Sequence, residues 1–181
     1  MVSGAASFNE FQDASARSDY LVQAFTANHP FVARLCDTGD AVTLRVITEN
    51  RGEGRVRLYS ATLEIPNVSG RMKFSHAIFP IDLDSGKIRP FPGKSLPVDT
   101  RRHLESVYTR ARGRSLPDWE QIRESALRAH LAYPGLFSVA WDFVLPPDGP
   151  MILEGNTGWD TRVPQMIHGG LLGDEIEQED L

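Results

Sequence analysis

The sequence predicts an α/β fold of the α+β kind, a mainly antiparallel sheet flanked by helices. Residues 42–48 and 55–65 are rich in β-branched side chains, alternate in polarity and are joined by a short loop of turn residues. A second hairpin is predicted for residues 137–154, where two apolar runs flank an Asp-Gly turn bounded by prolines. Apolar residues at helical spacing over 119–133 predict a helix to cover the sheet.

The composition is that of a globular domain. The chain has 181 residues, of which 41% are hydrophobic and 24% charged, and this is enough for one domain with a core. We expect a flexible segment over 1–19, a folded domain over 20–172 and an acidic tail over 173–181. A net charge of −5 without a basic block argues against nucleic acid as a partner.

No run of apolar residues approaches the length of about 20 residues that a membrane helix needs, so no membrane span is expected. The N-terminus lacks the basic start and long apolar segment of a signal peptide, which makes the cytoplasm the expected location. The single Cys36 excludes an internal disulfide, and we expect it to be a small buried side chain and not a nucleophile. The five histidines show no paired spacing, so a zinc site is not expected.

The remaining elements follow from local composition. Residues 89–99 contain three prolines and a glycine and predict a connector, and residues 100–114 are basic and amphipathic. Asp82 and Asp84 lack the rest of a calcium-loop pattern and are expected to form a turn. The other expected elements are a strand at 20–25, a helix at 31–35, a loop at 66–75, a hairpin-like strand and turn at 80–88, and a helix at 163–171.

The predicted hairpin at 137–154 brings two acidic residues together. Pairing about the Asp-Gly turn puts Asp142 opposite Glu154, and Asn156 points to the same face as Glu154. Opposed like charges destabilise a sheet unless something neutralises them, and carboxylate and amide oxygens suit Mg²⁺ or Mn²⁺. The alternative is that these acids face solvent or pair with arginines. The spacing alone favours neither interpretation.

Arg45 lies in the middle of the predicted strand 42–48. Alternation puts it on one face with Thr43 and Ile47, where a charge is costly unless it is matched. A guanidinium there can bind carboxylate and phosphate oxygens in a bidentate manner. The alternatives are a structural ion pair with Asp142 or Glu154, or a position at the sheet edge.

Several of these segments resemble a known family. Asp142, the Asp148-Gly149-Pro150 turn and residues 152–156 (ILEGN) resemble the metal-binding end of the ATP-grasp fold, in particular the sugar-transfer-associated group, which is also similar to glutamate-ligase-like proteins. Residues 20–23, 42–48 and 165–172 resemble its hinge strand, arginine strand and closing helix. The resemblance implies a nucleotide site for ATP with Gln23 at the adenine and with Arg45 and Asn156 as further contacts. It implies a metal site for Mg (or Mn) formed by Asp142, Glu154 and Asn156, with Arg45 catalytic.

The resemblance covers the C-terminal half of that fold. It implies an ATP-dependent ligase that joins a small-molecule carboxylate to an amine through an acyl phosphate. We expect a truncated sequence that is weak or inactive alone, or a site completed by a partner or a homodimer. Loop 66–75 departs from the family pattern, with Lys73 and then His76-Ala77 where related sequences carry an Asn and a Gly-Gly pair, so no role is assigned to Lys73, His76 or Arg162. The alternative function is a non-catalytic binding or interaction module, and a metal hydrolase is the least supported.

Overall fold

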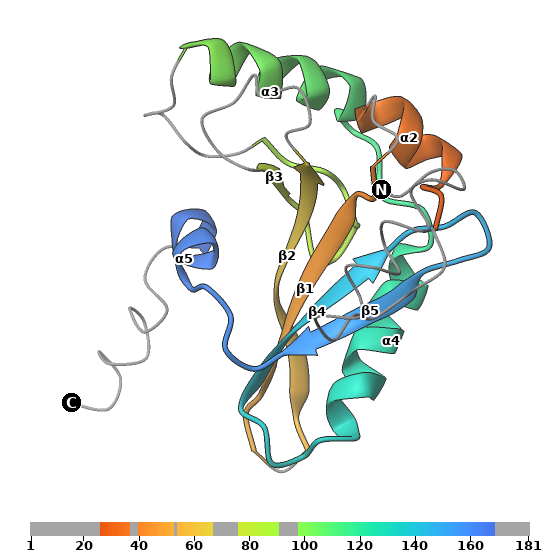
Figure 1. The fold of residues 1–181 in the computed structure, drawn as a ribbon. Helices are drawn as coiled ribbons and strands as arrows, with labels where there is room; N and C mark the ends of the chain where they lie inside the picture. The colour runs from red at the N-terminus through yellow and green to blue at the C-terminus, as the bar shows by residue number, and fades with distance from the viewer. Residues whose placement is uncertain (1–25, 37–39, 53, 67–75, 91–97, 169–181) are drawn as a thin grey trace, which may run out of the picture.

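The computed structural model describes residues 26–36, 40–52, 54–66, 76–90 and 98–168 (Figure 1). The predicted strand at 20–25 with Gln23, the loop residue Lys73 and the acidic tail all lie outside these ranges.

The described residues form a five-stranded sheet in the order β3-β2-β1-β4-β5. Each pair of neighbouring strands is antiparallel, so the predicted antiparallel sheet is confirmed. The central strand β1 pairs with β2 on one side and with β4 on the other. The strands span Thr43–Asn50 (β1), Val56–Pro66 (β2), His76–Pro80 (β3), Ser138–Val144 (β4) and Met151–Asn156 (β5).

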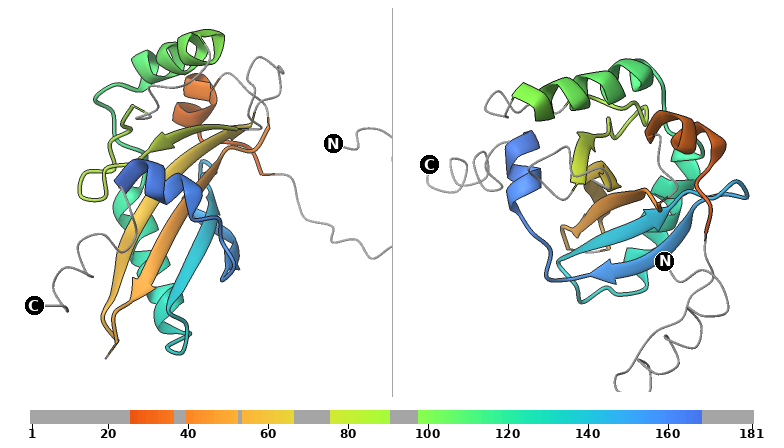
Figure 2. Two further views of the ribbon diagram at one scale, coloured as in Figure 1. Left: turned by 90° about the vertical axis from the view of Figure 1, so that its left-hand side faces the viewer. Right: turned by 45° about the horizontal axis from the view of Figure 1, so that its top comes forward.

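The helices lie on both sides of this sheet. They span Pro30–Cys36 (α2), Val98–Ala111 (α3), Trp119–Leu131 (α4) and Arg162–His168 (α5). Helix α4 packs along β1 and β2, and α2 contacts α3. Seen from the side, the sheet separates α4 from α5 (Figure 2). In the described part of the chain no helix has the length and apolar character needed to cross a membrane.

The two faces of the sheet differ in chemistry. The face toward α4 carries Leu44, Val46, Leu63 and Phe143, which are fully buried, and these pack with the apolar side of α4 in the core. Alternation therefore places Arg45 and its neighbours on the opposite face, which we call the polar face. The sequence prediction that Arg45 and Leu44 point to opposite sides agrees with this arrangement.

Four details differ from the sequence predictions. Strand β3, which ends at Pro80, was not predicted. In the hairpin-like segment expected at 80–88 the turn is confirmed, and the strand part is reduced to one bridge between Ile81 and Ile88. Helix α3 begins at Val98, inside the predicted connector. Helix α4 ends at Leu131, before the predicted end at 133. Each boundary depends on packing that local composition does not encode.

The turn after β3 is fixed against the start of α4. Asp82 accepts hydrogen bonds from the amide and hydroxyl of Ser85, which confirms its predicted role as a turn former. Gly86 follows with a φ of 68°, and a Cβ at this position would lie 2.4 Å from Cγ of Trp119. The indole N–H of Trp119 donates to the carbonyl of Leu83 at 3.1 Å. The turn therefore requires glycine for both its conformation and the close approach of the ring.

We expect Gly86→Ala to destabilise the protein more than Gly113→Ala. Gly113 has a similar φ of 74° but no atom within 4 Å of its Cβ position, so it reports the backbone cost alone. That cost is about 1 kcal/mol, and the displaced Trp119 ring adds about 2 kcal/mol at Gly86. Urea denaturation of the two variants measures the difference. Equal losses would show that Trp119 moves aside freely.

Candidate functional site

The hairpin formed by β4 and β5 carries the predicted acidic residues Asp142 and Glu154. Its turn includes Gly149, whose φ is 114°. The register pairs Asp142 with Glu154, as the Asp-Gly turn predicted, and pairs Ala140 with Asn156. An irregularity in β5 between these pairs and the turn was not predicted: Phe143 pairs with Ile152, which leaves Leu153 as the extra residue of a bulge.

Arg45 lies next to Asp142 on the neighbouring strand. The register of β1 places it directly between Asp142 of β4 and Thr62 of β2. Its Nε donates to Oδ1 of Asp142 at 2.8 Å and its Nη2 donates to Oδ2 at 2.9 Å, which is a bidentate pair. This hydrogen bonding is the main reason that the pKa of Arg45 is raised, against the opposing effect of burial. The guanidinium therefore stays charged at all relevant pH values.

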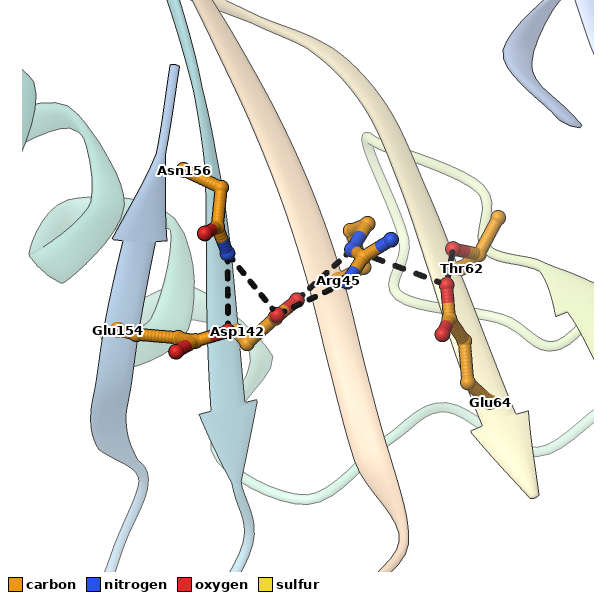
Figure 3. A network of polar contacts seen from close by, with 6 residues as sticks. All are labelled: Arg45, Thr62, Glu64, Asp142, Glu154 and Asn156. Atoms are coloured by element: carbon orange, nitrogen blue, oxygen red, sulfur yellow. Dashed lines mark hydrogen bonds and ion pairs between the residues drawn. The ribbon is translucent and has the colours of Figure 1, made fainter. Parts of the chain in front are cut away.

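Asn156 connects the two acidic residues. Its Nδ2 donates to Oδ2 of Asp142 at 3.3 Å and to Oε1 of Glu154 at 3.0 Å (Figure 3). Asp142 is 7% exposed, whereas the neighbouring Glu154 is open to solvent. The three side chains predicted as metal ligands therefore lie together, with one buried and one accessible carboxylate.

A third carboxylate, missed by sequence reasoning, lies on the other side of Arg45. Oε1 of Glu64 is 3.9 Å from Nε of Arg45 and accepts a hydrogen bond from the hydroxyl of Thr62 at 3.3 Å (Figure 3). The available signal was alternation, which places Glu64 of β2 on the same face as Thr62. The sequence did not give the register between β1 and β2 that brings this face beside Arg45.

We call Arg45, Glu64, Asp142, Glu154 and Asn156 the carboxylate cluster. Asp142 and Glu154, which share Asn156, carry two formal negative charges beside the single guanidinium of Arg45. Another acid on this sheet, Glu49, differs because two arginines, Arg51 and Arg57, bind its carboxylate. The carboxylate cluster therefore has an excess of negative charge that favours a cation.

The donor set of the cluster fits a hard divalent cation. Carboxylate and amide oxygens are the ligands that Mg²⁺ and Mn²⁺ prefer. In the structure the amide nitrogen of Asn156 faces both acids, so its oxygen reaches a shared cation only after the amide rotates. Within the described ranges no group of three or more His, Cys, Asp or Glu residues has the arrangement of a metal site, so the amide is needed to complete the set.

The loop after β5 lies close to the carboxylate cluster. Trp159 contacts Tyr59 of β2 with ring centroids 6.4 Å apart, and its indole N–H donates to the hydroxyl of Ser138 of β4 at 3.1 Å. Since β1 lies between β2 and β4, this side chain crosses the polar face. The loop then leads to α5 on the same side of the sheet (Figure 1).

Asp160 and Arg162 form a pair in this loop. Arg162 donates to Asp160 through its backbone N–H and its Nε, both at 2.9 Å from a carboxylate oxygen. The side-chain and backbone hydrogen bonds from Arg162 lower the pKa of Asp160 to about 2, and the positive charge of Arg45 contributes in the same direction. The Arg162 side chain is otherwise exposed, at 84%.

Other candidate residues lie apart from the cluster or cannot be placed. Cys36 is buried, and burial raises the pKa of its thiol to about 12, which agrees with the prediction that it is not a nucleophile. His130 is fully buried in the core. Gln23 and Lys73 lie outside the described residues, and the side chain of His76 is not described. The structure thus brings together Arg45, Asp142, Glu154 and Asn156, and their roles in binding stay predictions.

Comparison with known protein families matches residues 8–179 to the sugar-transfer associated ATP-grasp family. Because this match spans almost the whole sequence, the chain belongs to that family. The antiparallel sheet with flanking helices is consistent with an ATP-grasp-like fold. Membership implies an ATP-dependent, ligase-like function, and ATP-grasp proteins generally bind ATP with Mg or Mn. Searches among curated proteins and among solved structures gave no match.

The Arg45–Asp142 pair is expected to contribute to stability. A double-mutant cycle with Arg45→Gln and Asp142→Asn should give a coupling free energy of about 2 kcal/mol, because the hydrogen bonds are charge-assisted and partly buried. The matched control is the surface pair Arg123–Glu120, with Arg123→Gln and Glu120→Gln, for which about 0.3 kcal/mol is expected. Chemical denaturation of each variant provides the values. Equal coupling in the two cycles would contradict a special contribution from the Arg45 pair.

The ion pair between Asp160 and Arg162 leads to a prediction for the pKa of the Asp160 carboxyl. The carboxyl of Asp160 should titrate near pH 2 in the wild type and move toward its ordinary value of 3.8 in Arg162→Gln. Since the folded pKa is the lower one, the contribution of this pair to stability is present above pH 3.8 and is lost as the pH falls toward 2. NMR of the Asp160 carboxyl carbon measures both values. An unchanged pKa in Arg162→Gln would show that the pair does not persist in solution, and Arg162→Lys should give an intermediate value.

Proposed function

We propose that the chain forms the ATP- and metal-binding part of a ligase that joins a carboxylate to an amine through an acyl phosphate. The observation that carries this proposal is the carboxylate cluster, in which three acids and one amide surround a single guanidinium. An excess of negative charge beside a fixed positive charge is suited to a metal-complexed polyphosphate. Family membership supplies the reaction class.

Asp142, Glu154 and Asn156 are the residues that would hold Mg²⁺ or Mn²⁺. When bound, the metal supplies positive charge to the phosphate oxygens during phosphoryl transfer. The buried Asp142 provides a fixed ligand, because Arg45 holds both of its oxygens. The exposed Glu154 is the accessible ligand, and rotation of the Asn156 amide turns its oxygen toward the same point.

Arg45 would contact the transferred phosphoryl group. Its bonds to Asp142 use Nε and Nη2, so the remaining terminal nitrogen, Nη1, lies outside that pair. A guanidinium fixed in one plane by a carboxylate stabilises developing negative charge without reorganising during the reaction. Glu64, on the other side, limits the movement of Arg45 along the sheet.

The reaction has two steps, and neither needs a side-chain nucleophile. The substrate carboxylate attacks the γ-phosphorus, and ADP leaves. The amine then attacks the acyl carbon of the acyl phosphate, loses a proton, and phosphate leaves. The absence of a reactive thiol at Cys36 is compatible with this scheme. The assignment of Gln23 to adenine, and the contribution of a partner or further residues to the nucleotide site, remain parts of the proposal that come from the family resemblance.

The test measures binding, because the proposal does not require that this chain alone turns over ATP. We expect Mn²⁺ to bind the wild type, and Mn²⁺ or Mg²⁺ to increase its affinity for ATP. The Asp142→Asn/Glu154→Gln variant should lose both effects, with a decrease in metal affinity of at least about a hundredfold. Isothermal titration calorimetry and the electron paramagnetic resonance signal of free Mn²⁺ provide two independent measurements.

The matched control is Asp84→Asn/Glu124→Gln, which removes the same two charges from exposed positions outside the cluster. It should bind as the wild type does. A similar loss in both double variants would show that metal binding reflects net charge and would refute the site. A folded wild type that binds neither metal nor nucleotide would favour the alternative of a non-catalytic interaction module.

A further inference from the structure

The side chain that precedes Asp142 packs on the strand that carries the other two predicted ligands. Trp141 points to the core face of the sheet and pairs in register with Gly155, which lies between Glu154 and Asn156. A Cβ at position 155 would lie 2.6 Å from Cζ3 of the indole and 2.8 Å from Cε3. The six-membered ring of Trp141 therefore lies directly against the backbone of Gly155.

The indole is itself fixed by a buried hydrogen-bonded chain. The indole N–H of Trp141 donates to Oγ1 of Thr48 at 2.9 Å. Oγ1 of Thr48 is 2.7 Å from Nδ1 of His130, and Nε2 of His130 is 3.1 Å from the carbonyl of Leu136. We call Trp141, Thr48 and His130 the buried chain. It links β4 through β1 to the last turn of α4.

The directions of the hydrogen bonds made by Trp141 and by Nε2 of His130 follow from the groups involved. An indole N–H only donates, so Thr48 accepts from Trp141. The carbonyl of Leu136 only accepts, so Nε2 of His130 carries a proton. The Thr48 hydroxyl is also hydrogen-bonded to Nδ1 of His130, and the carbonyl of Val139 is a longer acceptor for it at 3.3 Å. Each buried donor has an acceptor, which fixes the orientation of all three side chains.

Within the described part of the chain, the strand under the indole has few other restraints. Among these residues β5 is an edge strand that pairs with β4 alone, and it contains the bulge at Leu153. Most of its residues, including Leu153, Glu154 and Gly155, are exposed. By contrast, Thr48 and His130 are 0% exposed and Trp141 is 6% exposed. The position of Glu154 and Asn156 relative to Asp142 therefore depends strongly on the contact between Trp141 and Gly155.

We propose that the buried chain is a positioning device for the carboxylate cluster. His130 and Thr48 fix the orientation of the Trp141 indole. The indole fixes how closely the backbone of Gly155 approaches the core and its register against β4. This places Glu154 and Asn156 beside Asp142. The residues act through Trp141 and do not contact metal or substrate. This inference rests on the proposed function only where it concerns metal affinity, because its structural part concerns the position of β5 alone.

The test compares Thr48→Val with Thr48→Ser. Valine has the shape of threonine but removes the acceptor of the Trp141 N–H and the hydrogen-bond partner of His130 Nδ1, whereas serine keeps the hydroxyl. We expect Thr48→Val to increase hydrogen exchange in the peptide spanning β5 and to weaken Mn²⁺ binding, each by about tenfold. Thr48→Ser should remain close to the wild type in both measurements.

Two further variants keep the result interpretable. Ile122→Val removes one methylene from the core side of α4, at a residue outside the buried chain, and should lower stability without changing β5 exchange or Mn²⁺ affinity. Trp141→Phe removes the part of the indole that lies on Gly155 and should reproduce the effect of Thr48→Val even if the latter folds poorly.

The outcomes separate this inference from the proposed function. Loss of stability in Thr48→Val with unchanged β5 exchange, or equal β5 exchange in Thr48→Val and Ile122→Val, would overturn the positioning role. If the wild type binds no Mn²⁺, the proposed function fails, and the exchange measurement alone decides whether the buried chain positions β5.

Discussion

The charge balance around Arg45 is the constraint on which the rest of the structure depends. Three carboxylates approach one another on a single face of a sheet, an arrangement that is unstable without a positive charge among them. Arg45 provides it from the central strand, and its bidentate bond to Asp142 joins β1 to β4 in addition to the backbone ladder. Arg45 carries one positive charge beside both Asp142 and Glu154, so it lets the cluster form without neutralising both acids.

The architecture keeps this charged group away from the apolar core. Helix α4 and the buried side chains of β1 and β4 occupy one face of the sheet, while the carboxylate cluster and the loop with Trp159 occupy the other. Strand alternation alone produces this separation, since neighbouring residues such as Leu44 and Arg45 point in opposite directions. On the neighbouring strand β4, Trp141 and Asp142 likewise point to opposite faces of the sheet. The core side chain of Trp141 therefore lies directly beneath the carboxylate cluster.

Much of the fold and most of the cluster could be predicted because they depend on short-range patterns. The Asp-Gly signal predicted a hairpin in which Asp142 faces Glu154, a pairing that the structure reaches through the bulge at Leu153, and alternation placed Asn156 and Arg45 on the right faces. Glu64 was missed because its approach to Arg45 depends on the register between β1 and β2, which includes an irregularity near Ile47. The bulge at Leu153 and the short strand β3 were missed because they arise from packing of the whole sheet. The contacts of His130 could not be predicted because they join residues 82 positions apart in the chain.

The position of Gly155 has a consequence for how this site can change over time. Any side chain there would collide with the indole of Trp141, so the spacing of the flanking residues Glu154 and Asn156 is tied to the composition of the core. If Glu154 and Asn156 bind a metal as proposed, the spacing of these ligands can therefore change only together with Trp141.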